Sequence, residues 1–145
     1  MLPSSADDIV HVIQLAVAPV FLLTGVGTLL MVLTNRLGRA VDRSRVLEKA
    51  FPEQQGEALA ATREELALIA RRTQLIYVAI ALAVLCALFV CLLIAVAFID
   101  AFIAADLAKL LGALFVLAML ALIGSLVVFL REIFLAVTSA RRAMH

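Results

Sequence analysis

Polar, small and ionisable residues in the first third of the chain recur at helical spacing. A projection at 100° per residue places these on one arc: Asp7, Gln14, Ala18, Gly25, Thr28, Asn35, Arg36, Arg39 and Arg43, with His11 at its edge. Phe21 and Val32 interrupt the arc. Because polar groups inside a membrane usually face a protein interior or a water-filled cavity, this arc could line a path for ions. Small and polar residues also mark ordinary helix–helix contacts, so packing is the alternative.

The other reactive side chains do not suggest catalysis. Cys86 and Cys91 cannot supply a zinc site on their own, and no Ser/His/Asp or Cys/His set is expected to converge. Gly25 and Gly27 form no phosphate-binding pattern. We therefore expect no enzyme, no metal, no cofactor and no nucleic-acid partner.

Three stretches without Asp, Glu, Lys or Arg are long enough to cross a bilayer: 9–35, 73–99 and 110–130. The chain is 66% hydrophobic, with a mean hydropathy of +1.16, whereas apolar residues make up about half of a soluble domain. A spanning helix needs roughly 20 apolar residues, and lipid leaves its backbone no other hydrogen-bond partners. The sequence predicts an all-α membrane protein with transmembrane helices at about 9–35, 73–99 and 107–130.

The segment between the first two spans continues both helices. Two runs of residues at helical spacing flank a break at 51–56, where Pro52 and Gly56 disfavour helix. The runs are Leu37, Val41, Ser44 and Leu47, then Leu59, Thr62, Leu66, Ile69 and Thr73. They predict an antiparallel helical hairpin over about 36–72, within a single membrane domain 1–145. Its partly polar seam makes it marginal alone, which favours support from neighbouring subunits.

Basic residues are segregated to one side of the predicted membrane. Eight lie in the segment 36–72, three follow the third span, and Lys109 is alone on the other side. The positive-inside rule predicts a cytoplasmic hairpin and C-terminus and an N-terminus outside, with His11 and His145 on opposite sides. Near the membrane surface, the arginines of the arc could also contact anionic lipid headgroups.

The second span carries small side chains at every fourth position. They are Ala79, Ala83, Ala87, Cys91 and Ala95. Such a row lets another helix approach closely, and we expect it to pack within or between subunits.

Several short motifs resemble those of a known family. They are Ala18-Pro19-Val20-Phe21-Leu22-Leu23, Leu33-Thr34-Asn35-Arg36-Leu37, Arg39, Asp42-Arg43-Ser44-Arg45, Arg71-Arg72 and Leu130-Arg131-Glu132-Ile133. Over about 9–137 the chain resembles the bacterial membrane family called domain of unknown function 2721. The resemblance implies a three-helix protein of the bacterial inner membrane. It implies no activity, so no functional residue is carried over from it.

Two functions fit these features. In the first, the chain forms a homo-oligomeric ion channel, because three helices per chain cannot comfortably enclose a conduit. Its outer mouth, middle and cytoplasmic exit would be lined, in order, by Asp7, His11 and Gln14, by Gly25 and Thr28, and by Arg36, Arg39 and Arg43. In the second, the chain is a non-conducting scaffold or regulatory subunit whose hairpin docks a partner or anionic lipid.

Overall fold

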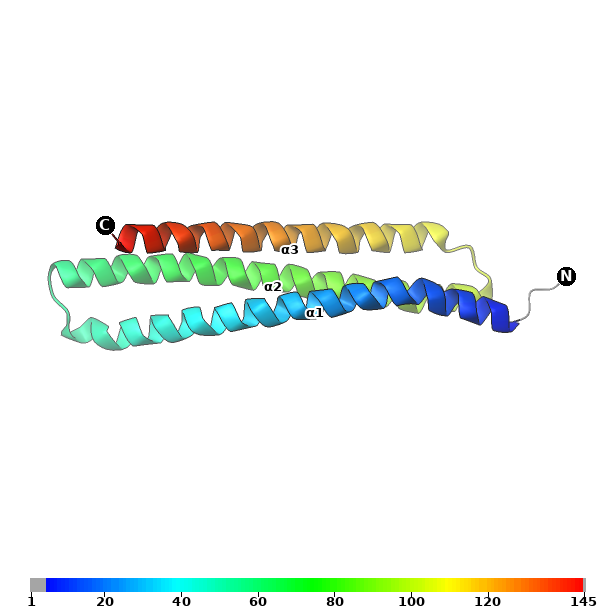
Figure 1. Cartoon of the computed structure of the whole chain (residues 1–145), viewed down its shortest axis with the longest axis horizontal. Coiled ribbons are helices and arrows are strands. Elements are labelled where there is room, and N and C mark those ends of the chain that lie inside the picture. Colours follow the sequence, from blue (N-terminus) through cyan, green and yellow to red (C-terminus); the bar gives the residue numbers. More distant parts are fainter. Residues whose placement is uncertain (1–4, 145) are drawn as a thin grey trace. The chain divides into compact units, whose positions relative to one another are not determined.

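All three long elements of the chain are α-helices (Figure 1). The computed structural model describes residues 5–144 and comprises α1 (Ser5–Ala50), a 3-10 turn η1 (Phe51–Glu53), α2 (Glu57–Ile103) and α3 (Ala108–Ala143). Within this range it contains no β-strand. Each of the three helices is long and apolar enough to cross a membrane. The predicted all-helical, multi-pass architecture is therefore confirmed.

The helices contribute to two compact units. Unit 1 comprises the described residues of 1–30 and 82–123, and unit 2 comprises those of 31–81 and 124–145. Each unit contains a segment of α1, of α2 and of α3. The residues of the predicted hairpin, 36–72, fall in unit 2.

Buried residues on each helix recur at steps of three and four or at multiples of seven positions. On α1 the row is Val12, Val26, Leu33, Ala40 and Leu47. On α2 it is Thr62, Ile69, Ile76, Ala79, Ala83, Cys86 and Val90, and on α3 it is Leu114, Ala118, Ala121, Ser125 and Glu132. A repeat of 3.5 residues keeps one narrow row turned towards partner helices, as in left-handed coiled coils.

The core of unit 1 is built largely from small side chains. It contains Val26, Ala83, Cys86, Val90, Ala118 and Ala121, with larger leucines and a phenylalanine packed around them. Lipid tails are as apolar as leucine, so helices in a membrane associate through close van der Waals packing, which small residues allow. Unit 2 has a smaller apolar cluster, formed by Ala40, Leu47 and Ile69 with Leu66 against it.

The predicted row of small residues on α2 follows this buried face only at its start. Ala79 and Ala83 are fully buried, Ala87 is half-buried, and Cys91 and Ala95 are exposed. A step of four residues advances about 400° around a helix, so the row drifts away from the face that Cys86 and Val90 continue. Packing of Cys91 and Ala95 on another subunit stays a prediction.

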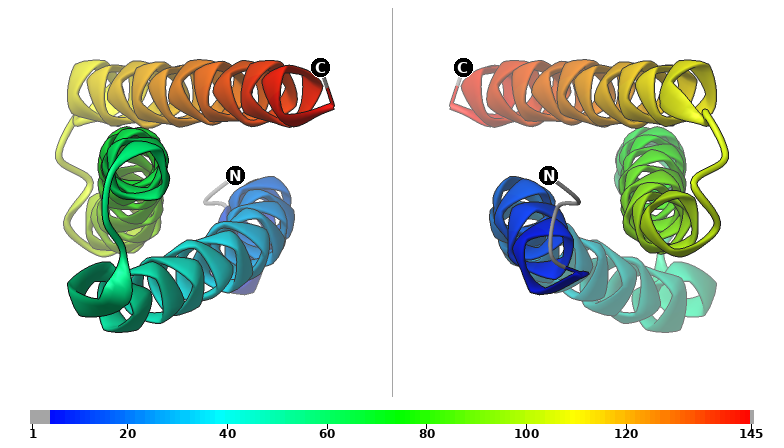
Figure 2. Two further views of the ribbon diagram at one scale, coloured as in Figure 1. Left: turned by 90° about the vertical axis from the view of Figure 1, so that its left-hand side faces the viewer. Right: turned by 90° about the vertical axis from the view of Figure 1, so that its right-hand side faces the viewer.

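Two short connections join the helices (Figure 2). After η1, the chain re-enters a helix through Gly56, whose φ of +69° favours glycine because it lacks a Cβ. The break predicted at 51–56 is therefore confirmed. At the other connection, the backbone N–H of Leu107 donates to Oδ1 of Asp100 at 3.2 Å. The carboxylate of Asp100 therefore accepts the N–H of the residue directly before α3.

One buried hydrogen bond joins two helices of unit 2. Ser125 Oγ donates to the backbone carbonyl oxygen of Ala79 at 2.7 Å, and both residues are fully buried. The bond requires close approach of α3 to α2, which the small side chain of Ala79 permits. It also satisfies a hydroxyl that is shielded from water.

We predict that Ser125→Ala lowers the free energy of unfolding by about 0.6 kcal/mol, the average for such bonds between membrane helices. The change removes the donor to Ala79 but keeps the small volume. Unfolding of detergent-solubilised protein by sodium dodecyl sulfate, followed by circular dichroism, measures the loss. Ser139→Ala is the matched control, because the Ser139 hydroxyl donates to Leu135 of its own helix. Equal effects of the two substitutions would contradict the role of the interhelical bond.

Candidate functional site

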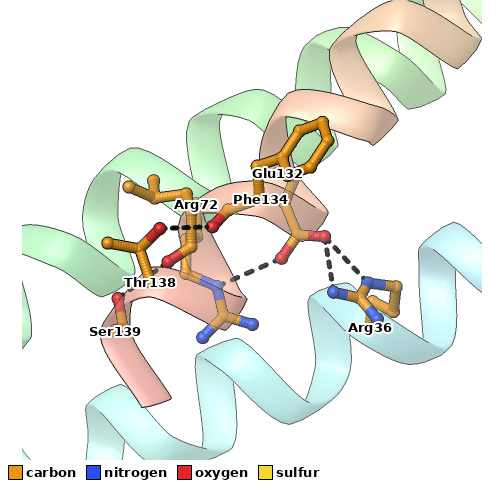
Figure 3. A network of polar contacts seen from close by, with 7 residues as sticks. Arg36, Arg72, Glu132, Phe134, Thr138 and Ser139 are labelled. Atoms are coloured by element: carbon orange, nitrogen blue, oxygen red, sulfur yellow. Dashed lines mark hydrogen bonds and ion pairs between the residues drawn. The ribbon is translucent and has the colours of Figure 1, made fainter. Parts of the chain in front are cut away.

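The most unusual side chain of unit 2 is a carboxylate with no exposure to solvent. Glu132 on α3 is 0% exposed, and it lies on the same buried row as Ser125. Arg36 of α1 and Arg72 of α2 reach it from two other helix segments (Figure 3). One acidic group thus joins all three helices within this unit.

The two arginines bind different oxygens of Glu132. Arg36 contacts Oε2 through Nε at 2.9 Å and through Nη2 at 2.6 Å. Arg72 donates from Nε to Oε1 at 3.1 Å. Hydrogen bonds between charged groups are shorter and stronger than neutral ones, so this arrangement satisfies both carboxylate oxygens.

Burial makes these ion pairs obligatory for the carboxylate. An isolated charge away from water costs several kcal/mol, and removing one partner of a buried pair typically costs about 3–5 kcal/mol. The Arg36 and Arg72 side chains remain 25% and 27% exposed, so they carry a smaller desolvation cost. The Arg36 guanidinium also lies 5.5 Å from the centre of the Phe129 ring, within the range of a cation–π contact.

All three residues lie at the borders of the apolar stretches. Arg36 directly follows the uncharged stretch 9–35, Arg72 directly precedes 73–99, and Glu132 lies two residues after 110–130. The site therefore ties the three helix segments of unit 2 together where each chain segment changes from apolar to charged.

A second ion pair joins α1 to α2 further along unit 2. Arg43 contacts Oε1 of Glu65 through both Nε and Nη2 at 2.9 Å. Both side chains are exposed, and exposed pairs are usually worth about 0–1 kcal/mol. This pair contributes less than the contacts of Glu132.

Most residues of the predicted polar arc lie on an open face of α1. Those exposed are Asp7, His11, Gln14, Ala18, Gly25, Thr28, Asn35, Arg39 and Arg43. Arg36 differs because it is half-buried and held by Glu132. The structure therefore brings Arg36, Arg39 and Arg43 near one another and turns Arg36 towards α3. Within residues 5–144, no group of three His, Cys, Asp or Glu gathers in a way that could hold a metal ion.

Glu132 is the functional candidate that the sequence-based reasoning did not single out. Two signals point to it in retrospect. It lies seven residues after Ser125 and fourteen after Ala118, so it continues the buried row of α3. It also lies in one of the motifs that carried the family resemblance, and its partners Arg36 and Arg72 lie in two others.

We predict that Glu132→Gln destabilises the protein more than Arg36→Gln does. The first change leaves two neighbouring arginines without their shared counter-charge, whereas after the second Arg72 still pairs with Glu132. A double-mutant cycle should give a coupling free energy of about 1–3 kcal/mol between Arg36 and Glu132. The measurement is the free energy of unfolding in detergent.

The control for this cycle is Arg131→Gln. Arg131 precedes Glu132 but is exposed, so its replacement should change the free energy of unfolding by no more than about 0.5 kcal/mol. If Glu132→Gln were no more harmful than Arg131→Gln, the ion-pair network would not hold the helices together.

Comparison with known proteins identifies the family. Residues 16–142 match the family described as "Protein of unknown function (DUF2721)". Comparisons with curated proteins and with solved structures gave no match. The matched range includes Arg36, Arg72 and Glu132, and it covers most of the chain. The chain thus belongs to the DUF2721 family.

Proposed function

We propose that the chain forms a homo-oligomer in a bacterial inner membrane, with α1 of each copy facing a central axis. The supporting observation is a row of exposed residues on α1 at alternating steps of four and three. It consists of Gln14, Ala18, Phe21, Gly25, Thr28, Val32, Asn35 and Arg39. This is the spacing that characterises the buried rows of the three helices, and it suits a left-handed helix pair.

The glycine in the middle of this row supports contact with another chain. A Cβ added at Gly25 would meet no atom within 4 Å, so no neighbour in the same chain requires glycine there. Glycine inside a helix is destabilising by roughly 0.5–1 kcal/mol relative to alanine. A close approach by a helix of another copy would offset this cost.

The oligomer could conduct ions along its axis. In this proposal Asp7, His11 and Gln14 line the outer mouth, and Gly25 and Thr28 line the middle. Asn35 and Arg39 then lie towards the cytoplasm, where 36–72 forms a helical hairpin and the C-terminus also lies. The excess of basic residues in that segment supports the orientation. The sequence also predicts Arg36 and Arg43 at the cytoplasmic exit of the pore. In the structure, however, Arg36 forms an ion pair with Glu132, and Arg43 forms one with Glu65.

The ion pairs of Arg36 and Arg43 favour a second candidate function, that of a non-conducting scaffold or regulatory subunit. The hydroxyl of Thr28 donates to Thr24 O of its own helix at 3.1 Å, so it does not need water. With Thr28 satisfied and Arg36 paired, the predicted polar arc offers fewer polar groups to a pore. In this case the α1 row packs against another copy without enclosing a path, and the hairpin docks a partner or lipid.

Cysteine cross-linking tests the self-association. In a Cys91→Ala background, Gly25→Cys should form disulfide-linked dimers in oxidised membranes, because the row brings two copies of α1 together. Val20→Cys is the control, since Val20 is exposed but lies on another face of α1. Equal cross-linking at the two positions, or none at either, would contradict contact along this row.

Planar-bilayer recordings separate the two candidate functions. For a channel, Arg39→Glu should change the ion selectivity of the current, because it reverses a charge on the row near the proposed exit. Thr28→Cys should also react with a charged, water-soluble thiol reagent. If no current flows under varied salt, pH and voltage, and Thr28→Cys does not react, the channel hypothesis is wrong and the scaffold hypothesis stands.

A further inference from the structure

We propose that unit 2 contains a binding site for a phosphate-type oxyanion between α1 and α2. A pocket of about 200 Å³ is lined there by Arg36, Arg39, Ala40, Arg43, Ile69 and Arg72. Four of its six lining residues are arginines, and none is acidic. This inference does not require self-association of α1, because all the lining residues belong to one chain.

The four arginines retain hydrogen-bond donors for a ligand. Arg72 uses only Nε on Glu132, and its two terminal nitrogens lie away from the carboxylate (Figure 3). Arg36 and Arg43 engage their glutamates through Nε and Nη2, so Nη1 of each has no such contact. Within residues 5–144, Arg39 forms no hydrogen bond or ion pair.

The lining arginines outnumber the acidic residues that pair with them. Glu132 and Glu65 are the acidic partners of three of the arginines, which leaves an excess of two positive charges. Neither glutamate lines the pocket. Glu132 instead holds Arg36 and Arg72 beside each other, so the buried carboxylate positions two guanidinium groups that would otherwise repel.

A phosphate group matches this arrangement. Planar guanidinium groups form paired hydrogen bonds to phosphate oxygens, and several arginines on one pocket can share the charge of one group. Arg36 and Arg72 directly border the apolar stretches, which is the level at which phospholipid phosphates meet a membrane protein. A phospholipid headgroup and free inorganic phosphate offer the same chemistry, so the experiment includes both.

Native mass spectrometry of the full-length protein in detergent tests the site. We expect phosphatidylglycerol to bind more tightly than phosphatidylcholine with the same acyl chains. Arg39→Gln should weaken phosphatidylglycerol binding roughly fivefold, the effect of one cation near an anionic lipid surface. Arg39→Lys should retain most of the binding. Because Arg39 is exposed and unpaired, neither change disturbs the contacts of Glu132.

Arg45→Gln is the matched control. Arg45 is exposed on the same helix and its replacement removes the same charge, but it does not line the pocket. Weaker phosphatidylglycerol binding by Arg39→Gln, with little change in binding by Arg45→Gln, supports the site. Equal weakening by both substitutions would show that the lipid binds through non-specific charge attraction, and this would overturn the proposal. The absence of binding to both phosphatidylglycerol and phosphate would also overturn it.

Competition with inorganic phosphate then distinguishes a lipid headgroup from a soluble phosphate as the ligand. If phosphate, compared with chloride at equal ionic strength, displaces phosphatidylglycerol from the wild type and not from Arg39→Gln, the pocket also accepts a soluble oxyanion. If displacement fails while the Arg39 effect persists, the ligand is the lipid headgroup. Cross-linking at Gly25→Cys is measured separately, so a failure of self-association is distinguishable from a failure of this site.

Discussion

The rest of unit 2 depends on the burial of one negative charge. Glu132 lies on the row of α3 that faces other helices, where an unpaired carboxylate would be strongly destabilising. Its two oxygens are satisfied by Arg36 and Arg72 on separate helix segments. This requirement fixes which faces of the three helices meet within the unit. It also brings two arginines together, and their remaining donors open onto the basic pocket between α1 and α2.

Packing along the helices follows from a second constraint, the 3.5-residue repeat. In lipid no hydrophobic force draws helices together, so contact depends on side chains that fit closely. Alanine, serine and cysteine on the repeated rows allow that approach, and Ser125 adds a hydrogen bond to Ala79. An exposed row on α1 has the same repeat. This row and the basic pocket are the two surfaces on which the proposals rest.

The two surfaces relate to the proposed functions in different ways. The proposed contact along the α1 row involves another copy of the chain, and its small residue Gly25 has no atom within 4 Å of an added Cβ. The pocket requires only an anion, because its four arginines come from one chain. Arg39 belongs to both surfaces. An anion bound beside Arg39 would therefore alter the charge at the Arg39 end of the α1 row, so the proposed anion site would affect either candidate function.

The sequence by itself determined the number of long helices, their apolar stretches and the break at 51–56. These depend on run length, hydropathy and the local preferences of Pro52 and Gly56, which act within a few residues. The tertiary structure decided which side chains meet. Arg36 and Glu132 are 96 positions apart, and the chain offers many other arginines to a lone carboxylate. The rotation of each helix about its axis selects among them, as it also decides that Ala83, and not Ala95, lies on the buried face of α2. That rotation is set by packing between distant segments, and no local pattern specifies it.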